Sequence, residues 1–589
     1  MNPYDEIHRG RVSKAMEHSY RRIAPFRALN AGLIEEYSGS SYSVGRVRRQ
    51  ILLNLINQLV VAYTMTLAAN RPRVLVTTRN SSMDQFAPVY QEAINRLIEE
   101  IHLEDVLRQA VLEAFFCIGI VKTHVADSVE VEIENGFWMD PGQPYASNIL
   151  LDDWVYDTSA TTWHKVQFAA DCYRIPYDSL KSDIFDQKVA SELSPTTKYN
   201  TNDSDNRVEN ISKGYETDWD EVEPQVDVMD VWIPRDRKIY TFPMDPGRRF
   251  AMKWDPLAVI DQDDPEIGPY HILGFHSVPG NIMPASPASH LSEMARLINN
   301  VMRKQGARAR NLKEIMIYTP AGGKDAQSVQ RTSDGGSAEV GAIDEVGTYR
   351  FGGVDSASQM FLGELIQYFD RMGGNLTAML GLGAQAETAA QEKLIHGAVS
   401  QTEAQMMART LDFSSKVIRD LGWMLWRDVM KTIPGQIPID GAEGYFLDAT
   451  WTPDYREGNF SDYDLQVDVY SMSYQSPGQR VQMINDLITN IYAKILPLLQ
   501  QQGGTIDVRE LTEIYADLLN LPRLKKAIQF AFQPAMDEAA SSPNSTSREY
   551  VRRSVSGNST VPAQSQVRQQ AWAHAAGQAG QPGVARFNS

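Results

Sequence analysis

Apolar residues recur at helical spacing through much of the first 115 positions. The uncharged stretch from Gln50 to Asn70 carries them three and four residues apart, and the stretch from Phe86 to Ala114 repeats this period. The spacing places apolar side chains on one helix face. We expect a buried helix over the first stretch and a pair of amphipathic helices over the second. Amides inside the first stretch argue against a membrane span, because they lack partners in hydrocarbon: Asn54, Asn57 and Gln58.

Alternation of apolar and polar residues then replaces the helical period. Val121 to Glu134 alternates in this way and predicts a hairpin or strand pair, and further strands are expected around 149–157, 226–240 and 271–278. The polar stretch 194–224 separates two of these segments and is expected to be a surface loop or a disordered excursion.

The pattern changes again after Pro284. Ala285 to Leu312 has a helical apolar stripe, and its far end carries four basic residues: Arg303, Lys304, Arg308 and Arg310. Lys313 to Gly353 follows, with a strand expected at each end and glycines between them. Ser356 to Met372 returns to helical spacing. The predicted unit is therefore two helices separated by a small insertion that contains strands.

Glycines mark the next boundary. Gly373 to Ala386 contains four glycines and is expected to be a loop, and 387–431 has one long helical pattern. Strands and turns are expected over 441–469, helices over 479–531, and an aperiodic tail over 534–589. The sequence as a whole predicts a mixed α/β fold rich in helices.

Composition narrows the class of protein. The chain has 589 residues, 43% of them apolar, and a formal net charge of -18, so bulk charge does not indicate a basic nucleic-acid-binding domain. An acidic chain could be an ordinary soluble protein, or a conduit in which DNA slides because few phosphates are neutralised. Two cysteines, Cys117 and Cys172, provide neither a disulfide framework nor a zinc site. The polar first 20 residues contain no apolar signal core.

No motif indicates catalysis. Gly381-Leu382-Gly383-Ala384-Gln385-Ala386 matches the spacing of a dinucleotide fingerprint, but helices are expected on both sides, where that fingerprint needs a preceding strand. Acidic residues cluster between Asp261 and Glu266 in one proline-bounded loop, which is more typical of a solvated turn than of a metal site. We therefore expect no catalytic residues, no cofactor and no metal ion.

The order of these segments resembles the portal proteins, or head-tail connectors, of tailed bacteriophages, in particular those of short-tailed phages. The resemblance covers roughly Arg46 to Ala531 and is strongest from Asp264 to Leu425. The stretches that carry it are DPEIGPYHILGF (264–275), VPGNIMP (278–284), the helix-insertion-helix unit, the glycine loop, and AQAETA (384–389), which opens the long helix.

The resemblance implies a ring of subunits, usually twelve, around an axial tunnel. It divides the chain into the N-terminal part of a wing domain (1–284), a first stem helix (285–312), a clip (313–354) and a second stem helix (355–372). A tunnel loop (373–386), the C-terminal part of the wing (387–475), a helical crown (476–531) and a flexible tail or barrel (532–589) follow. The tail lacks the heptads that an ordered barrel would need.

The resemblance also implies partners and sites. Double-stranded DNA would pass without sequence recognition, a terminase motor and tail adaptors would dock on the clip, and capsid and scaffolding proteins would surround the ring in the virion. Candidates for contact with DNA are the four basic residues of the first stem helix, although a solvated helix face with ion pairs between subunits is the more common role of such residues. Candidates in the tunnel loop are Gly373, Gly374, Asn375, Gly381, Gly383 and Gln385. Candidates for docking on the clip are Lys324, Asp325, Arg331, Asp334 and Glu339.

Two alternative functions remain open at this level. One is a metal-dependent nuclease that uses the acidic residues between Asp261 and Glu266. The other is a virion scaffold protein with the same order of helices and strands but no channel. Cleavage of DNA by the pure protein would favour the first, and particles without a central hole would favour the second.

Overall fold

The computed structural model describes most of the chain up to residue 472. The described residues are 3–39, 53–68, 70–125, 131–133, 137–139, 142–181, 184–198, 220–244, 250, 252–262, 266, 268–341, 344, 346–374, 376, 389–428, 432–438, 446–448, 450–468 and 471–472. Contacts divide the chain into two units, Met1–Ala527 and Ile528–Ser589, and every described residue belongs to the first. The expected helices of 479–531 and the tail lie outside the described residues.

Helices build the larger core. They are α2 (Leu55–Leu67), α3 (Ala87–Glu100), α4 (Leu103–Phe116) and α11 (Ala389–Arg427). The predicted helix pair is confirmed, and it breaks at His102, whose φ of 49° ends the helical path. The Tyr90 hydroxyl donates to the Gly422 carbonyl at 2.9 Å, and its ring stacks on Trp451. Buried apolar side chains of all four helices meet in this core, which fixes α11 against α3.

The uncharged stretch around residue 60 is a buried helix, as expected. Asn54 caps α2, because its side-chain oxygen accepts from the Asn57 N–H at 3.0 Å. Leu59, Val60 and Tyr63 are almost fully buried. Among the helices that the structure describes, none is long and apolar enough to span a membrane.

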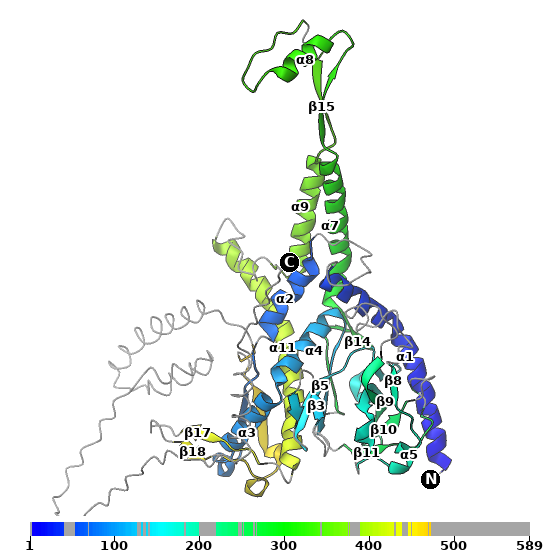
Figure 1. Cartoon of the computed structure of the whole chain (residues 1–589). Coiled ribbons are helices and arrows are strands. Elements are labelled where there is room, and N and C mark those ends of the chain that lie inside the picture. Colours follow the sequence, from blue (N-terminus) through cyan, green and yellow to red (C-terminus); the bar gives the residue numbers. More distant parts are fainter. Residues whose placement is uncertain are drawn as a thin grey trace, which may run out of the picture. The chain divides into compact units, whose positions relative to one another are not determined.

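A six-stranded antiparallel sheet carries the second core. Five strands lie in the order β11-β10-β9-β7-β6, and β8 also pairs with β9. Their bounds are β6 Trp154–Tyr156, β7 Ala169–Pro176, β8 Thr196–Lys198, β9 Asp220–Ile233, β10 Lys238–Pro243 and β11 Ala258–Asp261. The long helix α1 (Pro3–Ser38) packs on this sheet through Met16 and Ile23, as Figure 1 shows beside β9 and β10.

A three-stranded sheet in the order β12-β2-β5 lies between the two cores. Its strands are β2 Gly119–Val125, β5 Pro144–Asn148 and β12 Tyr270–Leu273. The expected local hairpin over 121–134 is wrong, because β2 pairs with β5 and the distant β12, while β3 (Val131–Ile133) pairs with β4 (Phe137–Met139). Both faces of β2 are buried from Gly119 to Thr123, so it is a central strand. A β-carbon at Gly119 would lie 2.1 Å from the Ala110 carbonyl oxygen. α4 can pack this closely on β2 because Gly119 has no side chain.

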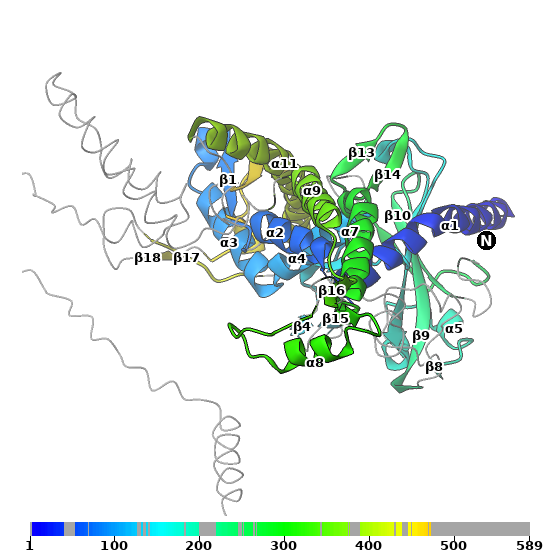
Figure 2. The same ribbon diagram turned by 90° about the horizontal axis from the view of Figure 1, so that it is seen from above.

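The helix-insertion-helix unit is present with corrected bounds. β14 (Asn281–Ala285) precedes α7 (Pro287–Arg310). Ser286 caps α7, because its side-chain oxygen accepts from the Ser289 N–H, and Pro287 occupies the first turn of the helix. The helix therefore begins two residues later than the sequence pattern indicated. α9 (Ser356–Met372) agrees with the prediction. Figures 1 and 2 show α7 and α9 side by side, and the two helices are in contact.

The insertion contains both predicted strands and one helix that the sequence did not reveal. β15 (Lys313–Tyr318) pairs antiparallel with β16 (Val346–Phe351). α8 (Gly323–Arg331) lies against β15 and buries Ala326. The glycines around it suggested irregular backbone, but Gly322 only precedes the helix.

The remaining elements are short. β1 (Val74–Thr78) pairs with β19 (Tyr463–Val467), β13 (His276–Val278) with β14, and β17 (Gln436–Pro438) with β18 (Phe446–Asp448). One short helix, α5, spans Gln187–Ala190, and 3-10 turns span Ser81–Met83, Trp163–Lys165, Tyr177–Lys181, Pro453–Tyr455 and Phe460–Asp462. The fold is therefore mixed α/β, as expected.

Candidate functional site

The hairpin formed by α7 and α9 is held together at both ends. Near the insertion, the Gly353 N–H donates to the Arg308 carbonyl at 3.1 Å, and the Arg308 guanidinium lies 3.6 Å from the Asp355 carboxylate. Toward the body of the chain, Leu365 and Phe369 are buried in the larger core together with Ile298. These contacts fix which face of each helix points toward the other.

The outer faces of the hairpin and its insertion are unusually apolar. More than half of the large apolar side chains that are exposed in the described chain lie between Leu297 and Met372. Met360 is 70% exposed, Tyr318 54%, Tyr349 52% and Tyr368 52%. Exposed apolar side chains concentrated on one part of a chain are typical of an interaction site.

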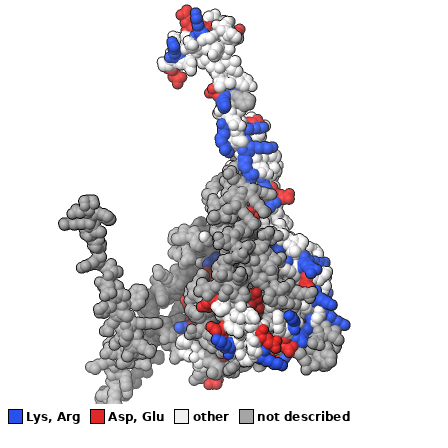
Figure 3. Space-filling model, turned by 45° about the vertical axis from the view of Figure 1, so that its right-hand side comes forward, with Lys and Arg blue, Asp and Glu red and all other residues white. Residues whose placement is uncertain are grey.

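The four basic residues predicted to contact DNA do not share one face. Arg308 points to Asp355 of α9, as described above. Arg303 and Arg310 are seven residues apart and lie on one flank of α7 together with Arg296, which is itself paired with Glu36 of α1. Lys304 is exposed beside them. Basic side chains gather along the hairpin in Figure 3.

The glycine segment after α9 starts from a tightly held position. The Tyr63 hydroxyl of α2 donates to the Gly373 carbonyl at 3.0 Å, and burial together with the charge of Glu403 raises the pKa of Tyr63 to about 12. Gly374 has a φ of +90°, and a β-carbon there would lie 2.2 Å from the Tyr63 oxygen. Leu376 is buried in the larger core. The other loop candidates, Asn375, Gly381, Gly383 and Gln385, lie outside the described residues.

Gly374→Ala should therefore destabilise the chain by about 1–3 kcal/mol, the usual cost of one strained backbone position. It should also accelerate amide exchange at Gly373 and Leu376, because Tyr63 has to move. Thermal unfolding and hydrogen exchange measure the two effects. Gly363→Ala is the matched control, since a β-carbon on that helical residue meets no atom within 4 Å. It should stabilise α9 by about 0.5–1 kcal/mol. Equal melting temperatures of wild type and Gly374→Ala would show that Gly374 is not held against Tyr63 as described.

The docking candidates of the insertion are mostly exposed. Lys324, Arg331, Asp334 and Glu339 are open to solvent. Asp325 is different, because its carboxylate accepts from the Gly341 N–H at 2.7 Å and so ties α8 to the returning strand region. Four of the five candidates are thus accessible to a partner, and Asp325 supports the shape of the insertion.

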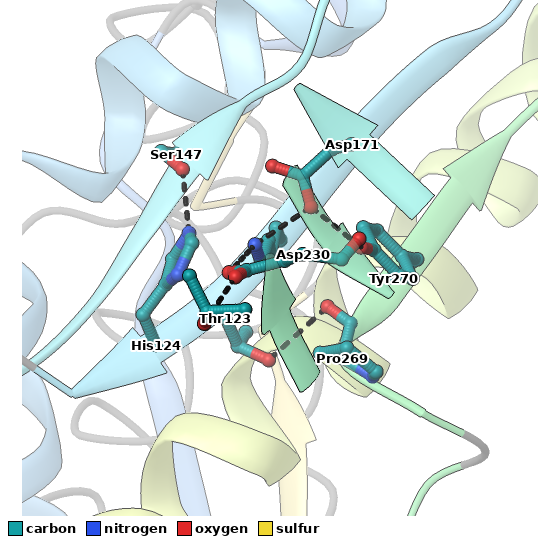
Figure 4. Close-up of polar contacts among 9 residues, drawn as sticks. Thr123, His124, Ser147, Asp171, Asp230, Pro269 and Tyr270 are labelled. Carbon is teal, nitrogen blue, oxygen red and sulfur yellow. Dashed lines mark hydrogen bonds and ion pairs between the residues drawn. The ribbon is translucent and has the colours of Figure 1, made fainter. Parts of the chain in front are cut away.

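A buried polar cluster lies where the two sheets meet, and no motif in the sequence indicates it (Figure 4). The Lys122 ammonium on β2 lies 2.7 Å from Asp171 on β7 and 2.6 Å from Asp230 on β9. The Tyr270 hydroxyl donates to Asp171 at 2.5 Å, and the Thr241 hydroxyl donates to Asp230 at 2.6 Å. Each charged member is at most 5% exposed.

Burial and mutual charge set the protonation of this cluster. Burial opposes the charge on Lys122, but Asp171 and Asp230 overcome it and raise the Lys122 pKa above its ordinary value. Burial also raises the pKa of Asp171, against the lowering effect of Lys122. His124, whose ring lies 2.8 Å from the Ser147 hydroxyl, has a pKa held well below its usual range by burial and by Lys122. No substrate reaches groups this deeply buried, so we interpret the cluster as a structural link between the sheets.

The remaining titratable candidates have ordinary partners. Asp261 lies 3.3 Å from Lys238 and Glu266 lies 3.4 Å from Arg419, while Asp263 and Asp264 fall outside the described residues. The His271 ring lies 2.9 Å from Asp420, in a contact that the sequence did not indicate. Both cysteines are buried and neither is part of a disulfide, and burial raises the Cys117 pKa to about 12. Among the described residues, no group of three or more His, Cys, Asp or Glu side chains is placed to hold a metal ion.

Comparison with known proteins assigns no relative to this chain. No family model matches the sequence, and no curated protein matches it significantly. The functional interpretation therefore depends on the hairpin, its insertion and the resemblance in segment order.

Proposed function

We propose that this chain is one subunit of a phage portal, a ring at one capsid vertex through which double-stranded DNA is packaged and later ejected. In this proposal α7 and α9 are the stem helices, the insertion is the clip, and Gly373 begins the tunnel loop. The ring itself is not an enzyme, and hydrolysis of ATP belongs to the docked terminase motor.

The exposed apolar surface of the hairpin is the observation that carries the proposal. Complete burial of a Leu, Ile, Phe or Met side chain contributes about 1.5–3 kcal/mol. Association that covers residues such as Met360, Phe361 and Tyr368 therefore contributes favourable free energy to assembly. A ring satisfies this requirement, because each subunit then covers the hairpin of the next.

The net charge of the chain is compatible with a conduit. The chain carries 74 acidic and 56 basic residues, so it is not a basic DNA-binding protein as a whole. Each phosphate that a protein neutralises adds salt-dependent affinity and would retain the DNA. Sparse cations allow DNA to slide.

The insertion is the proposed docking platform. Its exposed charged residues are two basic ones, Lys324 and Arg331, followed by two acidic ones, Asp334 and Glu339, and the insertion also exposes Tyr318. Apolar and aromatic side chains surrounded by charge are typical of protein interfaces. The terminase large subunit would dock here during packaging and tail adaptors afterwards, while capsid and scaffolding proteins would surround the ring.

Top-view electron microscopy of the purified protein tests this function. We expect toroidal particles with rotational symmetry and a central hole wide enough for a duplex. Mass photometry on the same sample should give one high multiple of the 66.1 kDa chain. Monomers, filaments or solid particles at micromolar concentration would rule out the portal, and metal-dependent cleavage of DNA would favour the nuclease instead.

A further inference from the structure

One flank of α7 presents arginines that have no acid to pair with in their own hairpin. Arg303 and Arg310 lie on this flank, and within the described chain the buried Nε of Arg303 has no hydrogen-bond partner. α9 packs on another side of α7, where Arg308 meets Asp355. The flank therefore faces away from the α9 of its own chain.

α9 presents a patch with the complementary chemistry. Met360, Glu364 and Tyr368 are four residues apart and form one ridge, with Phe361 beside it. Met360 is 70% exposed, Tyr368 52% and Phe361 46%. Glu364 is exposed in the middle of this ridge, and no ion pair or hydrogen bond holds its carboxylate in the part of the chain that the structure describes. We call these four residues the α9 patch.

The two helices also differ in net charge. α7 carries five basic residues and one acidic residue, whereas α9 carries two acidic residues and one basic residue. Arginine suits such a patch, because its planar guanidinium pairs with a carboxylate and stacks on an aromatic ring at the same time. The α7 flank and the α9 patch thus match in charge and in apolar character.

We propose that the α7 flank of one copy docks on the α9 patch of a second copy, with Arg303 paired to Glu364. This inference rests on the proposed ring and identifies the residues that join its subunits. Two different surfaces of the same chain meet in this contact, so it is heterologous, and repetition around an axis closes a ring. Arg303 and Arg310 then belong to the subunit interface, and DNA is not their partner.

A second copy explains the surface better than DNA does. Phosphates would satisfy Arg303 and Arg310 but would leave Met360, Phe361 and Tyr368 in water. A neighbouring hairpin covers the apolar ridge and neutralises both charges at once. One occupant therefore accounts for both surfaces.

Charge reversal with rescue tests the inference on the full-length protein. Arg303→Glu places like charges opposite each other and should raise the concentration for half-assembly, measured by mass photometry, by about tenfold or more. Adding Glu364→Arg should restore assembly to within about threefold of wild type, because the pair is re-formed with reversed charges. Lys304→Glu is the matched control, since it makes the same change on the next residue of α7 and should assemble as wild type does.

The outcomes separate this inference from the proposed function. Wild-type rings that persist unchanged in Arg303→Glu would overturn the inference and leave the portal in place. Intact Arg303→Glu rings that lose DNA retention would overturn it in favour of a DNA contact. Absence of rings in the wild type would overturn the portal itself. Circular dichroism on each variant confirms folding, which these surface substitutions should not change.

Discussion

Lys122→Met should destabilise the chain by about 3–5 kcal/mol, the usual cost of removing one partner from a buried ion pair. The substitution leaves Asp171 and Asp230 facing each other with no cation, at a site where each is at most 5% exposed. Thermal or urea unfolding of the purified protein measures the loss. We expect the two sheets to separate first, because the cluster is the charged link between β2 and the larger sheet.

The pH dependence of this variant has a definite sign. Burial raises the folded pKa of Asp171, and removal of Lys122 takes away the charge that lowers it, so the pKa stays above its unfolded value. Groups shifted in this direction contribute stability at pH below the unfolded pKa, and that contribution is lost as the pH rises through the folded pKa. The deficit of Lys122→Met relative to wild type should therefore be smaller at pH 5 than at pH 8.

A variant without charge in the cluster is the control. Lys122→Met combined with Asp171→Asn and Asp230→Asn keeps acceptors for Tyr270 and Thr241 but removes both buried carboxylates. It should recover most of the lost stability. Its remaining loss in free energy of unfolding relative to wild type should be nearly the same at pH 5 and at pH 8. If the single variant melts within about 1 kcal/mol of wild type, the cluster does not link the sheets as described.

Removal of the outer insertion should abolish partner docking and leave the body of the chain intact. Tyr318 lies opposite Val346 in the β15–β16 pair, so an Asn-Gly turn can replace residues 319–345 and close the strands. The replaced segment contains α8, whose contacts are with β15 and with its own loop. Stability should therefore change by less than about 1 kcal/mol.

Under the proposed function, this variant should still form rings while its affinity for the terminase large subunit falls at least tenfold. Pull-down or surface plasmon resonance with the purified motor subunit measures the second quantity, and electron microscopy measures the first. A milder control, Arg331→Ala with Glu339→Ala, changes two exposed residues of the same segment and should weaken docking less. Undiminished binding by the truncated variant would place the docking surface elsewhere.

The sequence pattern determined the helices of the candidate site because their contacts are local. The apolar stripes of 285–312 and 356–372 predicted α7 and α9 to within two residues at each end, and the short run 314–318 predicted β15. The first boundary was misplaced because Ser286 caps the helix and Pro287 opens it, a local signal that was overlooked. α8 was missed because neighbouring glycines obscured its short pattern, although Ala326 and Val329 have helical spacing.

Only the tertiary structure decided which strands pair and which charges meet. β2 was expected to pair with its neighbour in sequence, but its partner β12 lies about 150 residues away. Alternation of apolar and polar residues identifies a strand, but it does not say which strand it pairs with. Lys122, Asp171 and Asp230 belong to three separate strands, and no motif connects them before the sheets come together. Likewise, the arginines of α7 are evident in the sequence, but only the packing of α9 separated Arg308 from the flank that carries Arg303 and Arg310. Helical periodicity fixes a face through contacts a few residues apart, whereas the use of that face depends on which distant segment covers it.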